Sequence, residues 1–452
     1  MEPEKIIETL KDGLEGRPVD AYEICFIGCE RLLVEARNGA VESFSRVKHR
    51  GVALRALKDR KMGWGSSTDL SEPSLNRLVS SVIADAGEAS PSEESVIPKP
   101  HASKKAPGAE EAINEKRGRP LGEIPESDKI AVALKLEKIA RANPKISRVR
   151  QPLYEESVRH VVIHNSYGVH KNSSRGIVSC EVRAVAEADG DIESGWDFSF
   201  SPRFEDLDFE GAARRAAERS VELLGARPLA TGRYDVVFEP RPASQLLRLA
   251  APSFFADNVQ RKKSAIADKK GRAVFSRLIS IIDDGLLPDG YGSFPFDDEG
   301  VPRRKTTLVK EGVITNWLYD SQRAARDKKQ STGSRSRVSV HKPAGINISN
   351  CYVKEGDQEP AKLLAAAKKI FLVTDVMGLH TANTVTGDFS LGAEGFLVED
   401  GLKKRPVRGV LISGNIHELL AGVAAVGADL KFAGGHGAPS LFVAEVQVSG
   451  AG

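Results

Sequence analysis

The chain opens with a helical pattern of apolar residues and continues with strand-like alternation. MEPEKIIETLKDGLEG places its apolar residues on one face of a helix, and polar and apolar residues then alternate from Ala21 to Thr68. Alternation with a period of two is typical of strands with one covered face, and Asn38-Gly39 predicts a tight hairpin. SEPSLNRLVSSVIADAGEA returns to helical spacing behind Ser71, a candidate N-cap. Residues 1–90 therefore predict an N-terminal α+β domain.

A second region with the same pattern follows a change in composition. Residues 91–127 are rich in Pro, Ser, Glu and Lys and lack aromatic residues, which predicts an exposed linker or insertion with partial disorder. Beyond it come a helix over KIAVALKLEKIARAN, β-type runs over 146–204, and a helix over DFEGAARRAAERSVELLGA that stops at Gly225. We expect a second sheet-plus-helix region over 128–227.

Strand-like runs dominate residues 228–450. The strand GRYDVVFEP precedes a helix expected from about Pro242 to Gln260. Three shorter helices are expected near Ser321–Lys328, Pro360–Lys369 and Asn415–Val426. The predicted fold class is α+β, with two N-terminal sheet-plus-helix regions and a larger β-rich C-terminal domain.

Composition places the chain among globular proteins of more than one domain. Its 452 residues are 40% hydrophobic and 28% charged, values that are ordinary for a soluble protein. No run approaches the ~20 apolar residues of a membrane span, and the first residues lack the pattern of a secretory signal. Four cysteines are too few for a disulfide framework. We expect a cytoplasmic protein without a membrane span.

Charge is unevenly distributed although its formal net value is only +3. Between Arg261 and Lys342 there are 18 Lys and Arg residues against 10 Asp and Glu residues, a local excess of 8. Such a band could face nucleic acid, an acidic peptide or an acidic partner subunit, or it could be a solvated surface.

Common catalytic motifs are missing from the sequence. It has no P-loop, no dinucleotide-binding glycine motif after a strand and no G-x-S-x-G elbow. Cys25 and Cys29 would lie ~13 Å apart on a strand, too far to share a metal, so we interpret both as core residues. His160 and His164 also fall on a predicted strand, where their side chains diverge.

Two further groups are weak candidates for metal binding. His417-Glu418 begins like the zinc motif H-E-x-x-H, but no second histidine follows. The acidic run Asp297-Asp298-Glu299 could bind a hard cation. Gly300 and Pro302 instead favour a turn, with the acids paired to local cations; these are Arg303, Arg304 and Lys305.

Long motifs in the second half resemble a known family. DDGLLPDGYGSFPFDDEGVPRRKTTLVKEGVITNWLYDSQRAAR, STGS and NTVTGDFSLGAEGFLVEDG occur in the order found in the TldD/PmbA family of peptidase-related proteins. The resemblance covers the chain from about Tyr22 to Val448, and the G-D-F-S-x-G-x-x-G-F pattern is most similar to the PmbA (TldE) branch.

The resemblance implies a zinc site that this chain lacks. TldD-type members carry an H-E-x-x-x-H helix after a strand ending in an acid and Pro, and a Cys near the C-terminus. The histidines and the thiolate hold Zn²⁺, which activates water, while Glu takes its proton. In this chain the three motif positions hold Arg248, Leu249 and Ser253. The C-terminal stretch has no Cys, and His436 is its only possible ligand. We therefore expect no metal and no cofactor in this chain, with zinc carried by a TldD-like partner.

The polar loop HTANTVTGDFSLGAEGFLVEDG is the second region that the resemblance singles out. Its glycines would allow a peptide backbone to approach, and its hydroxyls could satisfy peptide groups. Alternatively, it is a glycine-rich strand–turn–strand whose hydroxyls bond locally. The candidate residues for a peptide-binding cleft are His380, Asn383, Thr384, Thr386, Gly387, Asp388 and Ser390.

Three functional hypotheses follow. The first is a PmbA/TldE-like, non-catalytic subunit that pairs with a zinc-bearing TldD-like homologue, or with itself, in peptide maturation or proteolysis of unfolded peptides. The second is an independent hydrolase that uses Asp388 with His380 or His436. The third is a regulatory binding protein of the DNA gyrase modulator type, although the sequence has no nucleic-acid-binding motif and nucleic acid is an unlikely partner.

Overall fold

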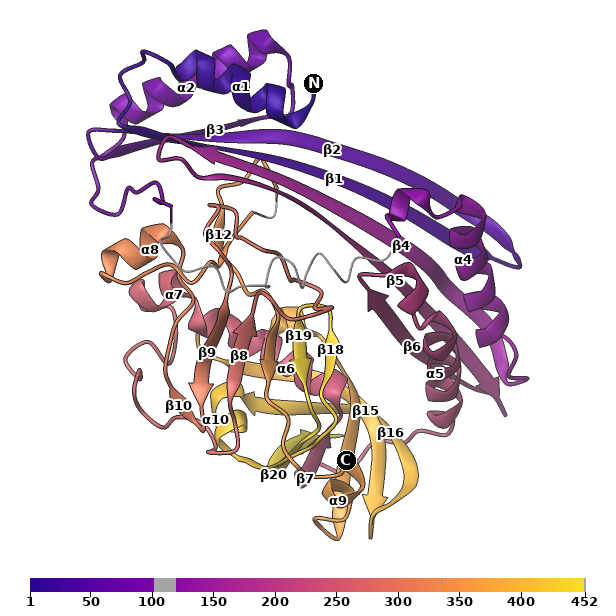
Figure 1. Cartoon of the computed structure of the whole chain (residues 1–452). Helices are drawn as coiled ribbons and strands as arrows, with labels where there is room; N and C mark the ends of the chain where they lie inside the picture. Colours follow the sequence, from indigo (N-terminus) through magenta and orange to yellow (C-terminus); the bar gives the residue numbers. More distant parts are fainter. Residues whose placement is uncertain (101–118, 338, 451–452) are drawn as a thin grey trace.

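A long, arched sheet from the N-terminal half of the chain lies over a β-rich C-terminal half (Figure 1). The computed structural model describes residues 1–100, 119–337 and 339–450. No helix in the described part of the chain is long and apolar enough to cross a membrane. The α+β prediction is confirmed.

Six antiparallel strands form the arched sheet, in the order β3-β2-β1-β4-β5-β6. β1 pairs with β4 from Glu23↔Asn165 to Glu35↔Leu153, so both predicted N-terminal regions contribute to one continuous sheet. The strands are β1 (Ala21–Arg37), β2 (Ala40–Lys58), β3 (Lys61–Ser67), β4 (Ile146–Asn165), β5 (His170–Ala188) and β6 (Asp191–Ser201). The hairpin at Asn38-Gly39 is confirmed, because both residues have positive φ between β1 and β2.

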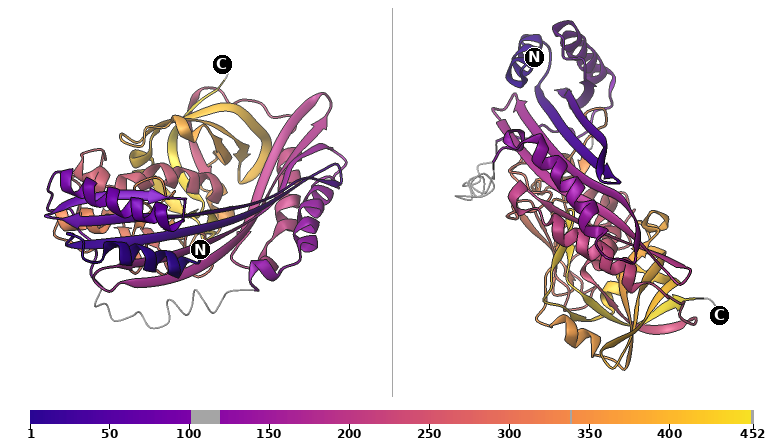
Figure 2. Two further views of the ribbon diagram at one scale, coloured as in Figure 1. Left: turned by 90° about the horizontal axis from the view of Figure 1, so that it is seen from above. Right: turned by 90° about the vertical axis from the view of Figure 1, so that its right-hand side faces the viewer.

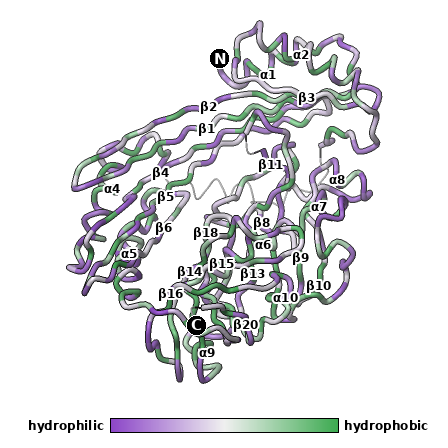
Figure 3. Tube along the Cα trace, turned by 180° about the vertical axis from the view of Figure 1, so that it is seen from behind, coloured by the Kyte–Doolittle hydropathy of each residue, from purple (hydrophilic) through white to green (hydrophobic). Residues whose placement is uncertain are grey.

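Helices cover the face of this sheet that points away from the C-terminal half (Figures 1 and 2). Hydrophobic and hydrophilic positions alternate along the long strands (Figure 3), as expected when only one face is packed against helices. The covering helices are α1 (Pro3–Leu14), α2 (Glu72–Glu88), α4 (Glu126–Ala140) and α5 (Phe209–Glu222).

Two six-stranded sheets form most of the C-terminal half. In the first sheet, β16 also pairs with β20, so five strands form a closed ring. These strands are β7 (Gly232–Phe238), β14 (Lys369–Met377), β15 (Asp388–Glu399), β16 (Leu402–Asn415) and β20 (Leu441–Ser449). The sixth strand, β17 (Val423–Val426), pairs with β20. The second has the order β10-β9-β8-β13-β19-β18. Its strands are β8 (Ile281–Asp284), β9 (Lys305–Lys310), β10 (Val313–Ile314), β13 (Cys351–Val353), β18 (Lys431–Ala433) and β19 (His436–Ala438). A two-stranded sheet pairs β11 (Arg335–Ser336) with β12 (Gly345–Ile346).

The predicted helices of this half exist but are shorter. The helix expected to reach Gln260 is α6 (Pro240–Ala250), followed by a 3-10 turn (Ala251–Phe254) and α7 (Ala256–Gln260). Pro252 lies at this break, where it cannot donate a helical hydrogen bond. The others are α8 (Ser321–Arg326), α9 (Pro360–Leu364) and α10 (Ile416–Ala421). The predicted helix to Val426 was wrong beyond Gly422, because the β-branched Val423 and Val426 pair with β20 instead.

The predicted linker is only partly described. Residues 101–118 lie outside the described residues. Before them, Ile97 is 5% exposed, and the side-chain amide of Asn165 donates to the carbonyl of Pro98 at 2.8 Å. After them comes a short 3-10 turn (Leu121–Glu123). The connection is therefore packed against the sheet at Ile97, where the sequence predicted exposure.

Ion pairs of Asp298 and Glu299 connect the arched sheet to the C-terminal half, and we call this set of contacts the charged joint. Asp298 accepts two hydrogen bonds, both 2.9 Å, from Arg159 of β4. Glu299, fully buried, lies 3.3 Å from Arg55 of β2 and 2.9 Å from Arg335. Burial opposes ionisation of Glu299, but the Arg335 and Arg55 guanidiniums outweigh it and lower its pKa.

These contacts correct one prediction from the sequence. The acidic run does form the predicted turn, with Gly300 at φ +76° and its amide donating to the Asp297 carbonyl at 2.9 Å. The expected local cation partners were wrong, because the turn points its carboxylates at strands far away in sequence. Arg303 and Arg304 donate instead to the main-chain carbonyls of Phe296 and Ser331, and Lys305 begins β9 as an exposed residue.

Candidate functional site

Two adjoining cavities, each about 450 Å³, form a cleft between the arched sheet and the C-terminal half. One wall is β6, the last strand of the arched sheet, and another is β18, the last strand of its own sheet. The floor is the start of α6. Six residues line both cavities: Arg215, Arg219, Glu239, Pro240, Arg241 and Lys431. The cleft thus has a strand edge on two sides.

Helix α5 supplies two arginines to the cleft because it lies very close to β6. A Cβ on Gly195 would come within 2.5 Å of the Ala216 carbonyl, so only glycine allows this approach. Arg215 binds Asp197 at 2.5 Å and Asp208 at 3.0 Å, and Arg219 donates to the Trp196 carbonyl at 3.4 Å.

Arg241, at the start of α6, connects the floor of the cleft to β6 and β14. Its guanidinium lies 3.2 Å from Asp375 of β14 and 4.4 Å from the centre of the Trp196 ring. It also donates to the carbonyls of Trp196 and Thr374, and Trp196 Nε1 donates to Asp375 at 2.7 Å. Burial lowers the pKa of Arg241, and the Asp375 carboxylate opposes this. This buried network holds β6, α6 and β14 in fixed positions around the cleft.

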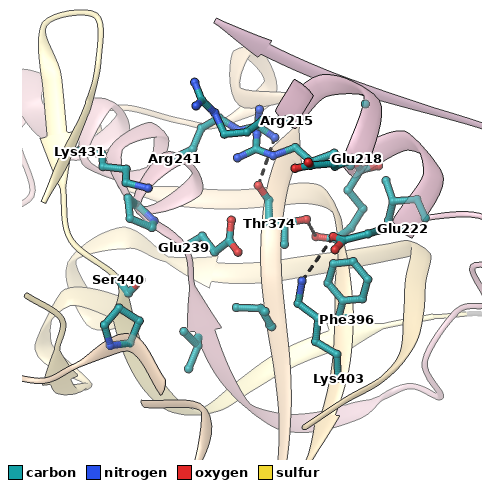
Figure 4. Close-up of a pocket in the computed structure, with 18 of the residues that line it drawn as sticks. Arg215, Glu218, Glu222, Glu239, Arg241, Thr374, Phe396, Lys403, Lys431 and Ser440 are labelled. Atoms are coloured by element: carbon teal, nitrogen blue, oxygen red, sulfur yellow. Dashed lines mark hydrogen bonds and ion pairs between the residues drawn. The ribbon is translucent and has the colours of Figure 1, made fainter. Parts of the chain in front are cut away.

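Two carboxyl groups in the cavity have raised pKa values. Figure 4 shows Glu239 pointing into the middle of the cavity, with Lys403 held by Glu222 at its side. Burial raises the pKa of Glu239. Burial, with the nearby charge of Asp375, raises the pKa of Glu394 to about 7. Carboxyl groups with raised pKa values in a cleft mark a candidate functional site.

The predicted zinc-motif positions lie on α6 and just after it. Ser244 lines the cleft, and Arg248 lies one turn further along α6 and is exposed. Leu249 is 6% exposed and packs in the hydrophobic core. Ser253 is buried, and its hydroxyl forms a 3.0 Å hydrogen bond with Nε2 of His417.

His436 lies close to Arg248. Burial is the main cause that lowers the pKa of His436 to about 4, and the charge of Arg248 adds to it. At the predicted motif positions, the charge of Arg248 therefore acts on His436, and Ser253 is bonded to His417. The His417-Glu418 pair was only a weak candidate from the sequence. No local pattern predicts that His417 contacts Ser253, which lies 164 residues away along the chain.

The polar loop after β14 is exposed and bonds largely to itself. The Asn383 side chain accepts from the amides of Val385 and Thr386, and the Thr386 hydroxyl donates to Asp388 at 2.7 Å. His380, Thr384 and Ser390 are exposed. None of the seven predicted residues lines the two cavities of the cleft. That the loop contacts a peptide stays a prediction.

The same loop packs against α10. Asn415 donates to Asp388 at 2.9 Å, and Gly387 lies so close to His417 that an added Cβ would be 2.6 Å from Nδ1. Hydrogen bonds from Thr386 and Asn415 lower the pKa of Asp388. Among the described contacts, Asp388 bonds to neither His380 nor His436, the pairs proposed for an independent hydrolase.

The remaining candidates from the sequence lie far from the cleft. Cys25 is buried in the core as predicted, whereas Cys29 is half-buried and lies 3.7 Å from the Ser157 hydroxyl. His160 and His164 lie on β4 as predicted, with His160 bonded to Asn172 at 2.8 Å.

Comparison with known proteins gives the family. Three models of the PmbA/TldA metallopeptidase match in order: domain 1 over residues 22–86, the central domain over 119–224 and the C-terminal domain over 231–450. The chain belongs to the PmbA/TldD family. It is 25% identical to the metalloprotease PmbA of Escherichia coli O157:H7, over 99% of this chain and 96% of that protein.

Solved structures agree with this membership. A candidate modulator of DNA gyrase from Thermotoga maritima has a TM-score of 0.89 at 25% identity, covering 99% of this chain and all of the other. TldE from Thermococcus kodakarensis has a TM-score of 0.86 at 22% identity, covering 99% of each chain.

The metallopeptidase name implies a metal, and the residues at the three predicted motif positions do not suit one. Arg248 carries a permanent positive charge, Leu249 offers no ligand atom, and the Ser253 hydroxyl is bound to His417. Among the residues that the structure describes, no three His, Cys, Asp or Glu side chains are grouped to hold a metal ion.

The residues that build the cleft were missed from the sequence. Trp196, Glu239 and Arg241 belong to segments correctly predicted as strand, strand end and helix start. Only the charged pair Glu239 and Arg241 around Pro240, at a strand–helix junction, could have pointed to a site.

Proposed function

We propose that this chain is a peptide-binding, non-catalytic member of the PmbA/TldD family that works with a zinc-bearing TldD-like homologue. The observation that carries the proposal is the occupation of the three motif positions. The charge of Arg248 acts on His436 of the neighbouring β19, Leu249 lies in the core, and Ser253 is bonded to His417. These residues neither bind zinc nor activate water.

The cleft supports an extended peptide as the ligand. Within the described part of the chain, β6 and β18 each have a strand neighbour on one side only, so a peptide between them could pair with main-chain groups of either edge. Main-chain pairing tolerates many sequences, which suits a substrate class of unfolded peptides. The aromatic side chains of Phe198 and Phe200 line the cleft beside this path.

Zinc analysis and a mixing assay test the proposal together. The purified, untagged chain is dialysed against metal-free buffer, and zinc is measured by mass spectrometry. We expect near-zero zinc and no cleavage of an unfolded peptide by the chain alone. Adding a homologue with an intact H-E-x-x-x-H motif should give cleavage faster than the homologue alone. About one zinc per chain with chelator-sensitive cleavage would refute the proposal, and cleavage that survives a chelator would favour an independent hydrolase.

A gyrase-modulating role is the second candidate, favoured by the description of the Thermotoga maritima protein. The basic band from Arg261 to Lys342 supports it less than the sequence suggested. Arg303, Arg335 and Arg337 of this band are at most 8% exposed, and Arg335 is neutralised by Glu299 and Asp320. DNA binding that weakens steeply with salt would support this role.

A further inference from the structure

Glu239 is a charged residue of the cleft whose side chain has no partner among the described contacts. It follows β7 and immediately precedes α6, and its carboxylate forms no hydrogen bond or ion pair with any residue that the structure describes. Its main-chain amide is fixed by the Val373 carbonyl at 3.0 Å, so the side chain is held over the cavity. A carboxylate that is largely removed from water and unpaired is costly, which makes it a group built to receive a partner.

Three cations of the cavity already have acidic partners, whereas Lys431, which lines both cavities, has none among the described contacts. Arg215 is bound by Asp197 and Asp208, Arg241 by Asp375, and Lys403 by Glu222. Lys403 also lies 4.1 Å from the centre of the Phe396 ring. The charges that act on Glu239 come from Arg219, Lys403, Arg241 and Lys431, and they favour its ionised form while burial opposes it.

The start of α6 is poorly suited to an anionic ligand. Pro240 and Pro242 are two of its first three residues, and neither has an N–H group to donate. An anion therefore lacks the main-chain donors that make helix N-termini good anion sites. Apolar side chains complete the cavity around Glu239, among them Val237, Leu372 and Phe396. Such walls suit an aliphatic stem that ends in a positive charge.

We propose that Glu239 recognises a primary ammonium group of the bound peptide, either its free N-terminus or a lysine side chain. This inference rests on the proposed peptide-binding function and assigns the specificity of the same cleft. Glu239 belongs to both cavities, so a peptide that lies along β6 passes directly over it. The ammonium group would then supply the partner that the carboxylate lacks.

Binding of four related peptides tests this inference on the whole chain. The probe is a short unstructured peptide with a fluorophore at its C-terminus, a free N-terminus and one internal lysine. The other three carry an acetylated N-terminus, norleucine in place of lysine, or both changes. We expect wild-type affinity, measured by fluorescence anisotropy, to fall about tenfold or more when the recognised ammonium is removed. The single changes show which of the two sources is bound.

Glu239→Gln should bind all four peptides with similar affinity, because the amide carries no charge. Glu218→Gln is the matched control, since Glu218 lines the same cavity but is exposed on α5, and it should discriminate as the wild type does. Equal binding of all four peptides by the wild type would overturn the inference and leave peptide binding standing, as would discrimination that persists in Glu239→Gln. Failure of all four to bind would remove the proposed function, and this inference with it.

Discussion

At the residue scale, the motif positions have new partners in place of a metal. Arg248 keeps a positive charge beside His436, whose pKa is about 4 because of burial and this charge. In Arg248→Gln, we expect the pKa of His436 to rise but to stay below its usual value of about 6.5, because burial remains the larger cause. NMR titration of the His436 ring measures this. Arg214→Gln, an exposed change on α5, should leave that pKa unchanged.

The same histidine predicts a loss of stability in acid. His436 titrates near pH 4 when folded and near 6.5 when unfolded, so the unfolded chain takes up the proton first as the pH falls. Its contribution to stability is therefore present above about pH 6.5 and is lost between 6.5 and 4, by up to about 3 kcal/mol. Urea unfolding at several pH values measures this loss. His436→Gln should have a flatter pH dependence in this window, and an unchanged slope would contradict the assignment.

At the scale of elements, the close packing of α5 on β6 positions one wall of the cleft. Gly195→Ala would bring a methyl group to 2.5 Å from the Ala216 carbonyl and push α5 outward. We expect a loss of about 1–3 kcal/mol in unfolding free energy, together with weaker peptide binding as Arg215 and Arg219 move. Gly87→Ala in α2 is the control. Its added Cβ would meet no atom within 4 Å, so that variant should be as stable as the wild type or slightly more stable. Equal stability of Gly195→Ala and Gly87→Ala would refute this account.

Elements with a local signal were predictable from the sequence, and contacts across the chain were not. The hairpin at Asn38-Gly39 and the helix break at Pro252 follow from backbone preferences of single residues. The pairing of β1 with β4 joins segments more than a hundred residues apart, and the meeting of β6 with β18 at the cleft depends on how the two halves pack. The family motifs indicated α6 as part of a site but did not indicate Glu239. Nothing in the sequence shows that the carboxylate of Glu239 has no partner among the described contacts of the folded chain.

At the scale of the whole molecule, buried charges join the two halves. Arg55 on β2 binds Glu23 of the same sheet at 2.7 Å, and it approaches Glu299 of the C-terminal half at 3.3 Å. Glu299 also accepts from the amide of Ser321 at the start of α8. The cleft lies between the same two halves, so we expect the joint to affect its width as well as the stability of the chain.

Replacing Glu299 tests whether this joint holds the halves together. Glu299→Gln removes one charge and leaves Arg55 and Arg335 buried with less compensation, so we expect a loss of about 3–5 kcal/mol in the free energy of unfolding. Glu155→Gln is the matched control, because Glu155 pairs with the exposed Arg31 and should cost no more than about 1 kcal/mol. Urea unfolding followed by tryptophan fluorescence measures both variants. Trp64 lies on β3 and Trp317 in the C-terminal half, so a loosened joint should separate their transitions. Equal losses in the two variants, with one shared transition, would show that the joint contributes no more than a surface ion pair.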